Sequence, residues 1–288
     1  MPIVTKAIGA KLKSCETDVS RRRILAFSAG IGATFERHFN DLHADGLVAF
    51  PTLCAMFEHA LLSNGFEDGI NPTNASLEEM RRGVHASQDT TFHAPIVHGL
   101  HVRANGRIVA IEPTPAGCLM KVHAELVDTR SQRQLVTSWI SLLFRDTGTI
   151  GTPGAVATPP ELPSEAIAGE ASVHVVKLPI ALTFAHVYTE CANIWNPIHT
   201  ERRAAKLAGL PQPILHGTAV WSLAILRIVE TFCDGDGTRV QRATVSFRAM
   251  VLAGTEATLR FARNGNWISY NVHNAADEIA LSGMIEIA

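Results

Sequence analysis

The stretch that decides the fold is Tyr188–Gly217, YTECANIWNPIHTERRAAKLAGLPQPILHG, in a chain of 288 residues. It holds an Asn-Pro-Ile-His run ending at His199 and an Ile-Leu-His-Gly run ending at Gly217. The second run opens an apolar segment, 214–232, whose large side chains recur near helical spacing. The sequence therefore predicts a polar motif leading into a long buried helix.

The bulk composition excludes several classes of protein. The chain is 47% hydrophobic and 18% charged, so it can bury a full core, and its net charge of −2 gives no case for nucleic acid or an acidic membrane surface. No run of 18 apolar residues and no signal-peptide pattern occur. The five cysteines are scattered without zinc-finger spacing, which favours a reducing compartment. We expect a cytoplasmic protein without a metal.

The chain divides into two halves that follow one plan. Residues 147–169 are rich in Gly, Pro, Ala and Thr and are typical of a linker, which leaves an N-terminal half, 1–146, and a C-terminal half, 170–288. Each half begins with a helix-compatible stretch, 21–35 or 182–196, and continues with an apolar segment that predicts a buried helix, 50–66 or 214–232.

Each half then ends in runs that predict antiparallel strands. These runs are 106–113, 118–128 and 134–146 in the first half, and 242–251, 256–264, 266–274 and 278–288 in the second. Asn105-Gly106 and Asn264-Gly265 are the dipeptides typical of hairpin turns, so we expect a turn at each. A long helix wrapped by an antiparallel sheet, used twice, predicts an α+β double hot-dog.

The motif resembles the signature of the MaoC-like, R-specific enoyl-CoA hydratase (hydratase 2) family. The resemblance is carried by Tyr188, Asn196, Pro197, His199 and Gly217. The first half resembles the non-catalytic N-terminal repeat of two-repeat members, through the runs 23–32, 50–52 and 84–95. The resemblance implies two hot-dog repeats in one chain, with a degenerate first repeat that forms a tunnel for a bulky acyl group.

The resemblance also implies roles for the motif residues. His199 is the base or acid, Asn196 positions it, and the Gly217 N–H stabilises the thioester oxygen at the start of the helix. Tyr188 forms a wall of the substrate site, and His216 is either a packed histidine or a substrate contact. The substrate is a bulky 2-enoyl or 3-hydroxyacyl thioester, and no metal or redox cofactor is required.

Ile194 departs from the family pattern, because it occupies the position of the family's catalytic aspartate. An isoleucine cannot transfer a proton, and a lost general acid or base costs about 10² to 10⁴ in rate. Three alternatives follow: a hydratase with a relocated acid, for which Glu190 is nearest; a one-base isomerase or carbon–carbon lyase that uses His199 in a site dried by Ile194; or a non-catalytic acyl-CoA-binding subunit. A thioesterase is disfavoured because Glu230 is the only acid on the predicted helix.

Basic residues near the motif are candidates for contact with the phosphates of CoA. Arg202 and Arg203 follow the motif directly, and Arg248 lies in a predicted strand. The carrier could equally be an acyl carrier protein. We expect neither nucleic acid nor a membrane as a partner, and we expect a possible homodimer because exposed edges of hot-dog sheets commonly pair.

Overall fold

The centre of the molecule is one long antiparallel sheet. The structure is a computed structural model that describes residues 2–76, 83–162 and 173–288. The strand order is β2-β4-β5-β6-β3-β10-β13-β12-β11-β9. In that order the bounds are Cys15–Asp18, His101–Thr114, Gly117–Asp128, Gln134–Arg145, Gly83–Phe92, Val240–Phe247, Ile279–Ile287, Trp267–His273, Glu256–Asn264 and His174–Pro179.

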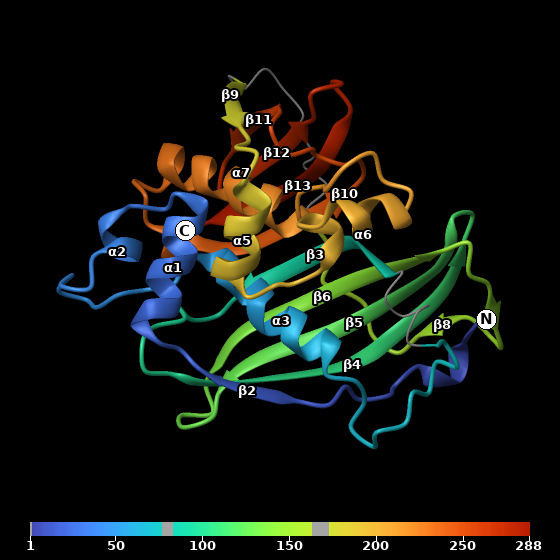
Figure 1. Cartoon of the computed structure of the whole chain (residues 1–288). Helices are drawn as coiled ribbons and strands as arrows, with labels where there is room; N and C mark the ends of the chain where they lie inside the picture. Colours follow the sequence, from blue (N-terminus) through green and yellow to red (C-terminus); the bar gives the residue numbers. More distant parts are fainter. Residues whose placement is uncertain (1, 77–82, 163–172) are drawn as a thin grey trace.

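The helices gather on one face of this sheet (Figure 1). The first half contributes α1 (Arg21–Ile31), α2 (Glu36–Phe39), the 3₁₀ turn η2 (Pro51–Leu53) and α3 (Cys54–Ser63). The second half contributes α5 (Phe184–Ala192), the 3₁₀ turn η3 (Pro197–His199), α6 (Arg202–Leu207) and α7 (Gly217–Phe232). The helices predicted from the apolar segments are thus present as α3 and α7.

The two halves join where β3 pairs with β10, from Arg242 opposite Thr91 to Ser246 opposite Ser87. On either side of this seam the strands follow the same spatial order, and one central helix crosses each side. This arrangement is the α+β double hot-dog that the sequence predicts. One hydrophobic core runs through both halves, and the Trp221 side chain of α7 is fully buried in it.

Short elements border the main sheet. β1 (Ile3–Val4) pairs with β7 (Thr149–Ile150), β8 (Gly154–Ala155) pairs with β4, and the 3₁₀ turns η1 (Thr5–Ala7) and η4 (Gly237–Arg239) complete the chain. Two of these strands, β7 and β8, lie inside the predicted linker. The part of that linker from 163 to 169 lies outside the described residues.

The predicted turn at Asn105-Gly106 is wrong, whereas the turn at Asn264-Gly265 is confirmed between β11 and β12. Asn105 and Gly106 lie inside β4, paired with Glu125 and Ala124 of β5. A side chain at position 106 would come within 2.9 Å of the Leu61 methyl group on α3. The glycine therefore allows the helix to approach the sheet closely and does not mark a turn.

The central strand β3 was not predicted, because its sequence is polar on both faces. Its inward side chains Gln88 and Thr90 are buried, and both belong to a hydrogen-bonded cluster around Glu58 of α3. The Ser138 hydroxyl of β6 donates to Glu58 and bonds Thr90. Burial raises the pKa of Glu58, and these bonds satisfy the oxygens of the carboxyl group.

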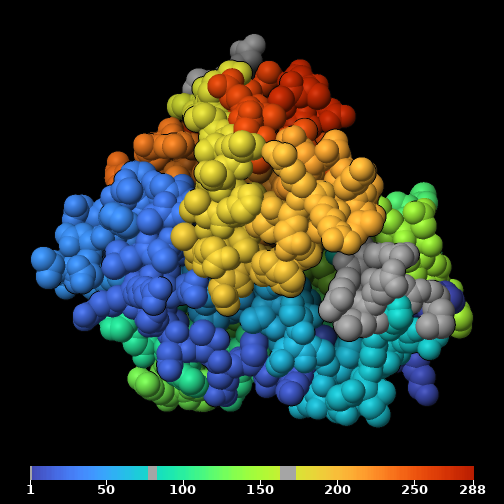
Figure 2. Space-filling model, in the orientation of Figure 1, coloured from blue at the N-terminus to red at the C-terminus, as the bar shows by residue number. Residues whose placement is uncertain are grey.

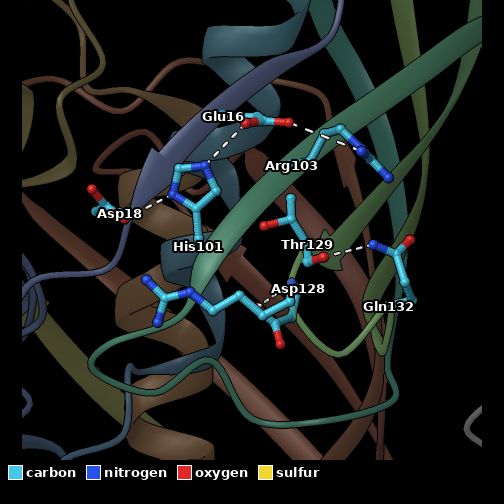
Figure 3. A network of polar contacts seen from close by, with 8 residues as sticks. Glu16, Asp18, His101, Arg103, Asp128, Thr129 and Gln132 are labelled. Atoms are coloured by element: carbon cyan, nitrogen blue, oxygen red, sulfur yellow. Dashed lines mark hydrogen bonds and ion pairs between the residues drawn. The ribbon is translucent and has the colours of Figure 1, made fainter.

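Charged residues fasten the outer strand β2 to β4 (Figure 3). The His101 ring lies between two carboxylates of β2, with Nδ1 2.7 Å from Asp18 and Nε2 3.0 Å from Glu16. These hydrogen bonds raise the pKa of His101, and His101 in turn lowers the pKa of Asp18. Across the described part of the chain, no helix is both long enough and apolar enough to cross a membrane.

Candidate active site

His199 is the ionisable side chain of the motif whose geometry favours catalysis. The turn η3 that carries it is capped by Asn196, whose side-chain oxygen accepts from the Ile198 N–H at 3.3 Å. The His199 Nδ1 lies 2.9 Å from the Ile214 carbonyl. Since a carbonyl only accepts, Nδ1 carries the hydrogen and Nε2 keeps its lone pair. Burial lowers the pKa of His199 to about 4, so the ring is a neutral base at neutral pH.

His216 supports this ring from the start of α7. The two imidazoles stack with centroids 3.7 Å apart. The His216 Nε2–H points at the Ile194 carbonyl (3.2 Å), with the Thr189 hydroxyl at 3.3 Å. Burial first, and then the charge of His199, lower the pKa of His216 to about 2. His216 therefore stays neutral and links the loop at Ile194 to the central helix, while its buried Nδ1 has no partner among the described residues.

Tyr188 and Ile194 form the apolar side of the site. The Tyr188 ring is fully buried on α5, 5.1 Å from His216, and Ile194 is 7% exposed. The Tyr188 hydroxyl lies near Thr218 and Ser222 but outside hydrogen-bond geometry, and burial raises its pKa. Neither residue offers a proton at neutral pH.

Gly217 begins α7, so its N–H has no acceptor within the helix. No loop carbonyl bonds this N–H among the described residues. A side chain at position 217 would come within 2.7 Å of the Phe247 ring at the end of β10. The glycine therefore permits close packing, and it leaves a free donor at the positive end of a helix dipole.

The first half contributes two histidines that the sequence did not assign to the site. His85 of β3 lies 4.7 Å from the Phe247 ring, and its buried Nε2 has no partner. His59 of α3 lowers the pKa of His85, His199 and His216 through its charge. His85 lies beside Phe247 because the two halves pair at β3 and β10, although the run 84–95 was already part of the family resemblance.

The remaining candidates lie at the surface. Glu190 is exposed on the face of α5 opposite Tyr188, and its backbone carbonyl accepts from Arg23 at 3.1 Å. The structure therefore does not bring the Glu190 carboxylate to His199. Arg202 and Arg203 on α6 and Arg248 after β10 are exposed and form no ion pair with any described residue.

Figure 2 shows α5 and the following segment on the surface between α1 and α3, so the motif lies where the two halves meet. Within the residues that the structure describes, no group of three or more His, Cys, Asp or Glu side chains is arranged to hold a metal.

Comparison with known families matches both halves of the chain. Residues 165–282 match the MaoC like domain, and residues 6–135 match the FAS1-like, dehydratase domain region. The MaoC like domain therefore matches nearly the whole second half of the chain. MaoC-like dehydratases are hydro-lyases, so the chain is an enzyme of the hydratase and dehydratase type.

Relatives with known names agree with this assignment. The probable enoyl-CoA hydratase 2 of Dictyostelium discoideum is 24% identical over 87% of this chain and 84% of its own length. The peroxisomal multifunctional enzyme type 2 of Mus musculus is 22% identical over 98% of this chain but only 38% of its own length.

Solved structures show the same fold. A MaoC-like dehydratase from Phytophthora capsici superposes with a TM-score of 0.78 at 16% identity, covering 99% of this chain and 97% of its own. A double hot-dog protein from Mycobacterium tuberculosis superposes with a TM-score of 0.62 at 13% identity, covering 97% and 96%.

Proposed function

We propose that this MaoC-like protein adds water across C2–C3 of a bulky 2-enoyl-CoA thioester, and removes it in reverse, with His199 as both base and acid. The observation that carries this proposal is the fixed tautomer of His199. Its Nδ1–H is held by the Ile214 carbonyl, so the Nε2 lone pair stays available, and the ring stacks on His216, the residue that precedes Gly217. The name of the Dictyostelium relative, a probable enoyl-CoA hydratase 2, supports the substrate class.

The reaction needs only these two groups. His199 Nε2 takes a proton from water while the water oxygen bonds to C3, and the double-bond electrons move to C2 and the thioester oxygen. The Gly217 N–H and the helix dipole stabilise the negative charge on that oxygen. The Nε2–H of the resulting imidazolium then protonates C2. One water molecule has been added, and His199 is again neutral.

A single base is favoured because no carboxylate of the described residues acts on His199. Besides burial, the groups that shift its pKa are the Ile214 carbonyl and His59. Glu190 faces away, and the buried Glu58 is already bonded to Ser138 and Gln88. Burial keeps His199 neutral before the reaction, and it also raises the free energy of the imidazolium form. During turnover the negative charge of the enolate beside the ring stabilises the imidazolium and offsets this cost.

The neutral His199 base also supports a second candidate function, a one-base isomerase or carbon–carbon lyase. The nearly buried Ile194 side chain keeps the site apolar, and proton removal next to a thioester carbonyl requires no activated water. This candidate predicts solvent-hydrogen exchange into the substrate without a gain of water. The third alternative, a non-catalytic acyl-CoA-binding subunit, predicts binding without either change.

Arg202, Arg203 and Arg248 are proposed to contact the phosphates of CoA. They are exposed cations without a carboxylate partner among the described residues, which suits a solvent-accessible anion. The double variant R202A/R203A should raise KM for an enoyl-CoA at least several-fold. It should leave KM unchanged for the matching N-acetylcysteamine thioester, which lacks phosphates. An equal effect on both thioesters would show that these arginines do not hold the CoA phosphates.

Glutamine at position 199 tests the catalytic assignment directly. His199→Gln should lower kcat/KM for hydration by about 10² to 10⁴. His93→Gln, at an exposed histidine away from the site, is the matched control and should retain wild-type hydration. Retention of activity in His199→Gln would remove every role assigned here to His199.

Two expectations from the sequence stay predictions. These are a homodimer through the outer strand β9, with its exposed Val175, and a cytoplasmic location.

A further inference from the structure

The two repeats hold a histidine in the same way. In the first repeat, the His38 Nδ1 of α2 lies 2.9 Å from the Val48 carbonyl. In the second, the His199 Nδ1 lies 2.9 Å from the Ile214 carbonyl. Each carbonyl comes three residues before the helical segment that opens at Pro51 or Gly217. His38 is therefore the structural counterpart of His199, although the first repeat has no Asn-Pro-x-His motif.

The backbone around each histidine repeats as well. An isolated bridge joins Val48 to Val97 in the first repeat and Ile214 to Leu252 in the second. The flanking hydrogen bonds also correspond. The Ala49 N–H donates to the Ile96 carbonyl (2.8 Å) as the Leu215 N–H donates to the Val251 carbonyl (2.9 Å). The Leu135 carbonyl accepts from the N–H groups of His93 and Ala94, as the Ala280 carbonyl accepts from those of Arg248 and Ala249. Residues 48–51 and 92–97 thus correspond to 214–217 and 247–252.

The first-repeat counterpart lacks the groups that catalysis needs. The Nε2 of His38 accepts the Gly237 N–H at 2.8 Å, so its lone pair is occupied, and the ring is fully buried. Pro51 replaces Gly217 and has no N–H to offer an oxyanion. Phe50 stands where the second repeat has His216. This location can bind a group but cannot perform acid–base chemistry on it.

A pocket is nevertheless present there, with a volume of about 210 Å³. Its walls are apolar, from Val48, Phe50, Pro51, Phe92 and Ile96, and the exposed side chains of Thr238 and Gln241 form a polar rim. The exposed His93 is the titratable side chain of this lining, and no carboxylate, lysine or arginine lines it. A cavity of about 150 Å³ is sufficient for benzene, so this pocket accommodates about six to eight carbon atoms.

We propose that this pocket is a second, non-catalytic site for the end of a medium-chain acyl group, with the polar head of the ligand at Thr238 and Gln241. The pocket follows from the geometry of the first repeat alone. The choice of an acyl chain rests on the function proposed above, because the counterpart site in the second repeat takes an acyl thioester. The ligand could be a free fatty acid or a thioester, since both present an apolar chain and a polar carbonyl.

The test uses the full chain with its Ile, Leu and Val methyl groups labelled for NMR, titrated with octanoate and, separately, with octanoyl-CoA, which is saturated and cannot be hydrated. We expect saturable shifts at Val48 and Ile96 with at least one of the two ligands. Shifts with octanoate alone assign the free acid, and shifts with octanoyl-CoA alone assign the thioester. Shifts confined to Ile214 and Leu252, or none at all, would overturn the proposal.

Two matched variants separate this pocket from the catalytic site. Ala94 and Ala249 are counterparts, and Ala94 lines this pocket, so leucine at position 94 fills it, whereas leucine at position 249 alters the corresponding position of the second repeat. Ala94→Leu should weaken binding at Val48 and Ile96 at least tenfold and keep hydration within twofold of wild type, whereas Ala249→Leu should do the reverse. Unweakened binding in folded Ala94→Leu would refute the site. If Ala94→Leu does not fold, the wild-type methyl shifts decide alone, and they do so whether or not the protein hydrates enoyl-CoA.

Discussion

Replacing Ile194 with aspartate should move the pH dependence of catalysis, because it places a negative charge beside the His199 base. The Ile194 carbonyl is one hydrogen bond from His216, whose ring stacks on His199. For the Coulomb estimate we take a separation of about 6 to 8 Å between a carboxylate at position 194 and the His199 ring. At an effective dielectric constant of about 20, this separation is worth about 2 to 3 kcal/mol of attraction to the imidazolium.

That attraction raises the pKa of His199 by about 1.5 to 2 pH units. In the wild type, burial holds this pKa at about 4, so kcat/KM should stay level between about pH 5 and 8. In Ile194→Asp the acid limb should appear at about pH 5.5 to 6. The new carboxylate can also share in proton transfer, so the plateau of kcat/KM should rise.

The assay is the initial rate of enoyl-CoA hydration at low substrate concentration across this pH range. Ile194→Asn is the matched control, since it adds a polar group of similar size without a charge and should leave the acid limb in place. Both variants remove a buried apolar side chain, which costs about 2 to 3 kcal/mol of stability, so the folded fraction is measured at each pH. A folded Ile194→Asp enzyme with an unshifted limb would refute the assignment of His199 as the titrating base.

Two further predictions concern stability. Asp89 and Arg242 form a buried ion pair across the seam, 2.6 Å apart with side chains 15% and 10% exposed, and linker carbonyls also bond the arginine. Asp89→Asn should therefore lower the free energy of unfolding by about 3 to 5 kcal/mol in urea titrations, because it leaves the arginine charge buried without its partner. Removal of an exposed ion pair on α7 should cost far less. A loss below about 1 kcal/mol in Asp89→Asn would show that water effectively solvates the Asp89–Arg242 pair. His216 has a folded pKa below its ordinary 6.5, so the unfolded state takes up its proton first as the pH falls. The wild type should then lose about 2 kcal/mol more stability between pH 7 and pH 5 than His216→Phe does, and equal losses in both would contradict the neutral, buried state of this ring.

The sequence could predict the helices and most strands because their apolar residues follow a regular period. It could not predict β3, because the polar residues Gln88 and Thr90 face inward and are satisfied only by Glu58 of a distant helix. Asn105-Gly106 misled for a related reason, since its glycine serves contact with Leu61 and not a turn. Local pattern does not report contacts between elements remote in the chain.

The candidate site shows the same division. The motif predicted His199, Gly217 and the apolar position 194 as site residues, because all three lie within one short stretch of sequence that leads into a helix. The contribution of His85 and His59, the outward direction of Glu190, and the equivalence of His38 with His199 all depend on how the repeats pair. The equivalence of His38 with His199 is the hardest of these to predict from sequence, since helix α2, which carries His38, shares no motif with the turn η3 that carries His199.

The most direct test of hydration by His199 is to incubate the wild type and His199→Gln with 2-enoyl-CoA thioesters in deuterated water and to follow the products by mass spectrometry. We expect the wild type to add one water, of which one deuterium remains non-exchangeable at C2, and His199→Gln to do so at least about 100-fold more slowly. Deuterium incorporation without a gain of water would contradict the hydratase and favour the one-base isomerase or lyase. Equal rates of hydration in the two proteins would contradict the role of His199.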